Sequence, residues 1–114
     1  MSYQRGDVVW GPDPFKSVEN PRPWLILHND RHPFGDEEYM TITLTTTPHD
    51  AGVTIDDADW IEGGMPRQSY ASPWTVASPK DAALVRREGR LAEPFVQEVV
   101  SAVERYLEPP EESV

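Results

Sequence analysis

Residues 22–27 read Arg-Pro-Trp-Leu-Ile-Leu, and they join a loop rich in turn-forming residues to the most apolar run before Met40. Pro23 disfavours a helical backbone at Arg22, so the arginine is expected to stay extended at the junction of loop and strand. The four apolar residues that follow predict a buried strand. An always-charged guanidinium at the mouth of such a strand suits a phosphate, although the pattern also fits a surface arginine with no ligand.

Size and composition predict one domain. The 114 residues include four Trp, four Tyr and three Phe, enough to close one core, and no break in composition indicates a second. We expect the domain to span residues 1–108 and an acidic, proline-containing tail at 109–114 to be disordered. No apolar run reaches the length of about 20 residues that a membrane helix needs, and the N-terminus lacks the apolar region of a signal peptide. These features predict a soluble, cytoplasmic protein.

Two features of the composition limit the chemistry. The chain has no cysteine, which excludes disulfides, thiol nucleophiles and thiolate metal sites. Its formal net charge is −10, with twenty acidic residues against eight arginines and two lysines. Such a charge is opposite to the basic surface of most nucleic-acid binders, so either the partner is not nucleic acid or the protein works at very high salt. The scarcity of lysine beside retained arginine favours high salt, and hence a halophilic source.

The remaining pattern predicts short strands and one helix. Strands are expected at residues 5–10, 24–27, 39–45, 53–55, 69–76 and 84–91. Pro73 interrupts the fifth strand and should therefore lie at a sheet edge or a bulge. In the third strand, Met40, Ile42 and Leu44 are expected on one face and threonines on the other. From Pro94 the apolar residues recur at three- and four-residue spacing, which predicts a helix ending near Leu107. We therefore expect a mostly β, antiparallel small barrel closed by a C-terminal helix.

Two threonines stand where the third strand ends. Because Arg22 opens one strand and Thr45 and Thr46 close the next, antiparallel pairing would bring them to the same end of the sheet. We expect Arg22 and one of these threonines to reach a common phosphate. His28, His32 and His49 also lie beside predicted strand ends, where two imidazoles on either side of a phosphate could act as general acid and base, but each also fits a turn or surface histidine.

The order of these motifs resembles that of the MazF/PemK toxins of bacterial and archaeal toxin–antitoxin systems. The similarity rests on RGDVVW at residues 5–10, the Arg22-Pro23 strand, the LTT strand end at 44–46, SPWTV at 72–76, GRL at 89–91 and the final helix. It covers residues 5–107. Together with the charge, it indicates a halophilic archaeon as the source.

The resemblance implies an SH3-like barrel that forms a homodimer and acts as a sequence-specific endoribonuclease (mRNA interferase), cleaving single-stranded RNA without metal or cofactor. Arg22 and either Thr45 or Thr46 would form the catalytic pair, and Glu19 in the preceding loop is the preferred general base. Lys16, Asn20 and His28 are expected to contact RNA. A small antitoxin would place a disordered tail in the RNA groove. The alternatives are a non-catalytic SH3-like binding module, a topoisomerase poison like that of a sister toxin family, and a homologue that has lost its activity.

Overall fold

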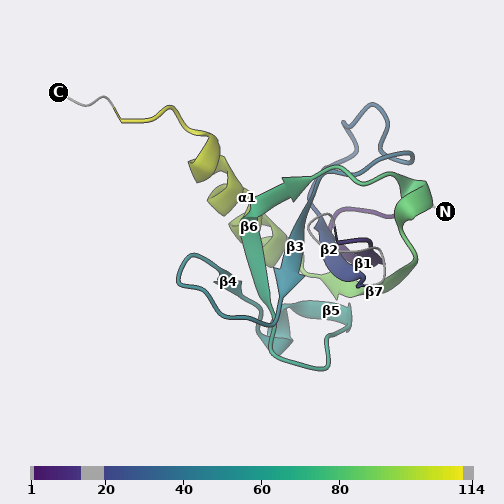
Figure 1. Cartoon of the computed structure of the whole chain (residues 1–114), viewed down its shortest axis with the longest axis horizontal. Coiled ribbons are helices and arrows are strands. Elements are labelled where there is room, and N and C mark those ends of the chain that lie inside the picture. Colours follow the sequence, from purple (N-terminus) through teal and green to yellow (C-terminus); the bar gives the residue numbers. More distant parts are fainter. Residues whose placement is uncertain (1, 14–19, 112–114) are drawn as a thin grey trace.

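The computed structural model describes residues 2–13 and 20–111. In these residues seven strands form one curled antiparallel sheet in the order β4-β6-β3-β2-β1-β7-β5 (Figure 1). The elements are β1 (Asp7–Gly11), β2 (Arg22–Ile26), β3 (Thr41–Thr45), β4 (Val53–Thr54), β5 (Trp60–Gly63), β6 (Tyr70–Ala77), β7 (Arg86–Leu91), α1 (Glu93–Leu107) and the 3₁₀ turns Asp57–Asp59 and Asp81–Ala83. The prediction of a mostly β fold with a C-terminal helix is confirmed.

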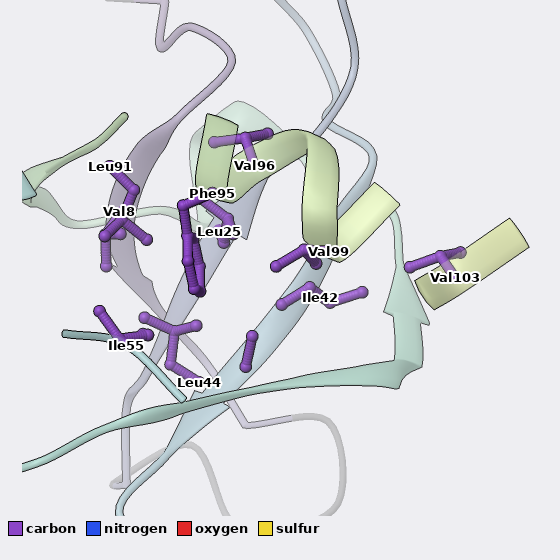
Figure 2. Close-up of a cluster of buried hydrophobic side chains, with 11 residues drawn as sticks. Val8, Leu25, Ile42, Leu44, Ile55, Leu91, Phe95, Val96, Val99 and Val103 are labelled. Atoms are coloured by element: carbon purple, nitrogen blue, oxygen red, sulfur yellow. The ribbon is translucent and has the colours of Figure 1, made fainter. Parts of the chain in front are cut away.

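Helix α1 covers one face of the sheet. Its predicted apolar stripe is buried through Phe95, Val96, Val99 and Val103, which pack on side chains from the strands (Figure 2). The strand residues of this cluster are Val8, Leu25, Ile42, Leu44, Ala71 and Leu91, with Ile55 from the chain after β4. Leu107, near which the helix was predicted to end, is its last residue and is 75% exposed, because the helix extends beyond the sheet.

The opposite face of the sheet, which carries the threonines of β3 as expected, is also buried. Val9, Ile26 and Tyr39 form a second cluster on this side. Thr41 and Thr43 are 0% and 1% exposed, because the sheet curls over them. Met40, which was expected to share a strand face with Ile42 and Leu44, precedes β3 and is 49% exposed.

An edge or a bulge was predicted at Pro73, and β6 contains a bulge there. Ser72 pairs with Thr43 and Ala77 pairs with Thr41. The four residues of β6 between these pairs therefore lie opposite a single residue of β3. At the bulge, the hydroxyl of Thr75 replaces a backbone partner: it accepts from Thr43 N at 2.9 Å and donates to Ser72 O at 2.6 Å. Bulges commonly re-aim side chains near functional sites.

Strand β5 was not predicted. It pairs with β7 at the edge of the sheet, in a segment where the sequence analysis placed no strand. The expected tail lies partly outside the described residues, and positions 109–111 are exposed and irregular. Within the part of the chain that is described, no helix combines the length and the apolar character needed to cross a membrane.

Candidate functional site

Arg22 and Thr45 face each other where β2 begins and β3 ends. Trp24 is paired with Thr43, and continuing this antiparallel register by two residues brings Arg22 across from Thr45 on the same face. The guanidinium is tied to β3, because its Nη2 donates to Leu44 O at 3.0 Å. The side chain of Arg22 remains 27% exposed, so solvent, or a ligand, has access to the charge.

These residues line a surface cavity of about 520 Å³. Of the positions predicted from the sequence, the cavity brings together Arg22, Thr45, Thr46 and Asn20, and residues not predicted complete its wall, among them Asp13, Met65 and Ser69. Arg22 is the one basic side chain among the described residues that line it. We call this hollow the Arg22 cavity.

The two threonines differ in geometry. Thr45 is the last residue of β3, half-buried, and its Oγ1 accepts from Thr47 N at 3.1 Å. A hydroxyl that accepts one bond can still donate its own hydrogen, here to an acceptor in the cavity. Thr46 follows the strand and is exposed. The register therefore favours Thr45 as the partner of Arg22.

Asp13 is the residue that sequence reasoning missed. It is 4% exposed, and its Oδ2 lies 3.6 Å from Nη1 of Arg22. The pairing of β1 with β2 explains its position: Gly11 is paired with Arg22, so the residues that follow β1 pass beside the guanidinium. A buried carboxylate beside Arg22 orients the guanidinium and partly neutralises it.

The other predicted positions lie elsewhere. Lys16 and Glu19 fall outside the described residues. His28 follows the far end of β2, where it lines a separate cavity with His32 and Gly35. There its Nδ1 accepts from Met40 N at 3.1 Å, and burial, aided by the charge of His32, lowers its pKa. His28 therefore lies at the wrong end of the strand to contact a phosphate held by Arg22.

Metal ligands are also sparse in the described part of the chain. No three His, Cys, Asp or Glu side chains of residues 2–13 and 20–111 come together in a group that could hold a metal ion.

Comparison with known proteins identifies the fold. No protein-family model matches the chain, and no curated protein matches it in sequence. Among solved structures, it is similar to a mycobacterial endoribonuclease in complex with its cognate antitoxin, with 19% identity, a TM-score of 0.70, and 97% of this chain and 98% of the other covered. The Mycobacterium tuberculosis toxin MazF-mt6 aligns at 18% identity and a TM-score of 0.68, over 89% and 95% of the two chains. The MazE–MazF structure from Deinococcus radiodurans gives 13% identity and a TM-score of 0.70, over 94% and 96%. The chain thus has the fold of the MazF toxins.

Proposed function

We propose that this protein is an endoribonuclease toxin of the MazF/PemK type that cleaves single-stranded RNA without a metal ion. The observation that carries the proposal is the placement of Arg22 opposite Thr45 in one cavity, at the position that the sequence resemblance assigns to the catalytic pair. The whole-chain similarity to structures named as endoribonucleases supports it.

The proposed reaction uses the RNA as its own nucleophile. The 2′-oxygen attacks the adjacent phosphorus, the P–O5′ bond breaks, and the products are a 2′,3′-cyclic phosphate and a 5′-hydroxyl. The 2′-OH proton passes to a general base, and the 5′-oxygen takes up a proton as it leaves. Arg22 and the Thr45 hydroxyl would donate to the phosphoryl oxygens, whose negative charge grows in the transition state. Glu19 remains the proposed base.

The binding partners and the working salt concentration of the protein follow from the same proposal. One of the similar mycobacterial structures is an endoribonuclease in complex with its cognate antitoxin, and the one from Deinococcus radiodurans holds MazE with MazF. We therefore propose that a small antitoxin also regulates this protein, and that the protein is a homodimer. We further propose that the net charge of −10 is an adaptation to high salt, where repulsion between the protein and RNA is screened.

The test is cleavage of a long, unstructured RNA in EDTA, across a KCl series. Wild type should produce fragments with cyclic phosphate and 5′-hydroxyl ends. Arg22→Lys and Thr45→Val should each lower the single-turnover rate by about 100-fold or more, the usual cost of losing a transition-state donor. Thr46→Val is the matched control and should cut at close to the wild-type rate. Wild-type protein that leaves the RNA intact at every salt concentration refutes the proposed function and favours a non-catalytic binding module.

A further inference from the structure

A second cavity adjoins the Arg22 cavity. It has a volume of about 430 Å³, and Arg22, Thr45 and Thr47 line both hollows. Its far wall comes from β6 and from the chain between β3 and β4, through Trp74, Tyr70 and His49. The residues proposed to hold a phosphate therefore form the boundary between the two cavities.

The chemistry of this second cavity is unusual for the protein. Although the chain has twenty acidic residues, none of the described residues that line the cavity is Asp or Glu, and Arg22 supplies a positive charge. The lining includes an indole, a phenol and an imidazole ring. An apolar, aromatic hollow free of carboxylates beside an arginine suits a flat, uncharged ring attached to an anionic backbone.

The bulge in β6 explains why Trp74 is available. It is one of the four residues that lie opposite a single residue of β3, so it is not constrained to the regular in-and-out alternation of a strand. Its neighbour Thr75 anchors the bulge by its bonds to Thr43 and Ser72. Trp74 is left 42% exposed, and the His49 ring packs against it at a centroid distance of 4.9 Å and an angle of 56°.

We propose that this second cavity binds an unpaired nucleobase of the RNA, next to the phosphate held by Arg22, with the base stacked on Trp74. This rests on the proposed function and deepens it by assigning a base-binding subsite. Stacking on aromatic side chains is the general way in which proteins hold unpaired bases, and the volume is within the range of small-ligand sites. We call the hollow the base cavity. Trp74 touches substrate in this proposal but takes no part in the chemistry of cleavage.

The test separates base binding from backbone binding and from cleavage. Two fluorescently labelled probes of equal length and charge are used: a 2′-O-methyl oligoadenylate, which has no free 2′-hydroxyl to attack, and the same strand with abasic positions. Affinities are measured by anisotropy at about 0.15 M and about 2 M KCl, because screening alters the electrostatic part. The quantity of interest is the ratio of the two dissociation constants, which isolates the contribution of the bases.

Wild type should bind the oligoadenylate at least about tenfold more tightly than the abasic strand, the scale of stacking on one aromatic side chain. Trp74→Ala should bring this ratio close to one, and Trp74→Phe should keep part of it. Val76→Ala is the matched control, since Val76 is on the same strand, 53% exposed, and outside both cavities. It should retain the wild-type ratio.

Several results would overturn the base cavity. They are a wild-type ratio near one, an unchanged ratio in Trp74→Ala, or an equal loss in Val76→Ala. A changed molecular mass of Trp74→Ala in light scattering would instead assign the indole to a contact between copies. If wild type shows a Trp74-dependent ratio but leaves RNA intact, then the proposed cleavage fails and the base cavity stands.

Discussion

Replacing Asp13 by Asn tests how the structure sets the position of Arg22. The change removes a buried charge 3.6 Å from the guanidinium and keeps the shape of the side chain. At that distance two unit charges attract by about 4–5 kcal/mol at an effective dielectric constant of about 20, and the cost of burying Asp13 offsets much of this. Because Arg22 is 27% exposed, water can replace part of the lost interaction. We expect the free energy of unfolding to fall by about 1–2 kcal/mol, between the values for exposed and buried pairs.

The effect on cleavage should be larger than the effect on stability. Without Asp13 the guanidinium keeps its bond to Leu44 O but loses the second point that fixes its orientation. A misplacement of about 1 Å costs about 100-fold in rate, so we expect kcat to fall between about tenfold and 100-fold. KM should stay the same or fall, because the substitution removes a negative charge from a cavity proposed to bind phosphate.

The assay is single- and multiple-turnover RNA cleavage as a function of pH, with Asp30→Asn as the control. Asp30 is an exposed carboxylate away from the Arg22 cavity, and its replacement changes the net charge equally. A positioning role predicts a lower rate with the same pH profile, whereas loss of a general base would remove the acidic limb of that profile. An unchanged kcat in Asp13→Asn, or an equal loss in Asp30→Asn, refutes the reasoning.

Four further predictions concern stability. Phe95→Ala, which empties a core position 3% exposed, should lower Tm by at least about 10 °C, whereas Leu107→Ala on the same helix should leave it nearly unchanged. Thr75→Val leaves the buried Thr43 N–H without its acceptor, so we expect a loss of about 1–3 kcal/mol in denaturant unfolding and a smaller preference for bases over abasic strands. Burial, with the hydrogen bond to Asp81, raises the pKa of Tyr39 to about 12, above the value of about 10 in the unfolded chain; wild type should therefore lose stability from about pH 10 towards 12, and Tyr39→Phe should lack this part of the loss. Tm should rise between about 0.1 and 2 M KCl as the repulsion within a net charge of −10 is screened, and a flat or falling Tm contradicts the high-salt explanation.

The sequence was most informative where local rules and tertiary packing agree. The Pro23 restriction and the apolar run after it locate β2, and the helical period after Pro94 locates α1 to within a residue at each end. Antiparallel pairing of neighbouring strands then places Arg22 and the threonines at one end of the sheet. Each of these steps depends on residues close together in the chain, which is why they could be made without coordinates.

Where the structure departs from the prediction, contacts between residues far apart in the sequence determine burial, strand formation and the position of side chains. Thr41 and Thr43 follow the alternation of a half-exposed strand, yet both are buried because the sheet curls. Strand β5 is four residues long, and its last residue, Gly63, has a φ of 62°, so nothing in its sequence marks it as a strand until β7 pairs with it. His28 follows β2 in sequence as closely as Asp13 follows β1, but only the register shows which of the two lies beside Arg22.

The base cavity shows the same limit in the part of the protein that matters most for function. Pro73 in a predicted strand indicates a bulge, but the sequence does not say how many residues the bulge contains or which side chain it releases. If the bulge had only one extra residue, Trp74 would follow the usual alternation of a strand, and its register would decide which face of the sheet its side chain is on. With four residues of β6 opposite one residue of β3, as observed, Trp74 lies beside His49 on the far wall of the base cavity. The length of the bulge is fixed by the pairing of Thr41 with Ala77 and of Thr43 with Ser72. A change in that register would therefore move the proposed base site without altering Arg22 or Thr45.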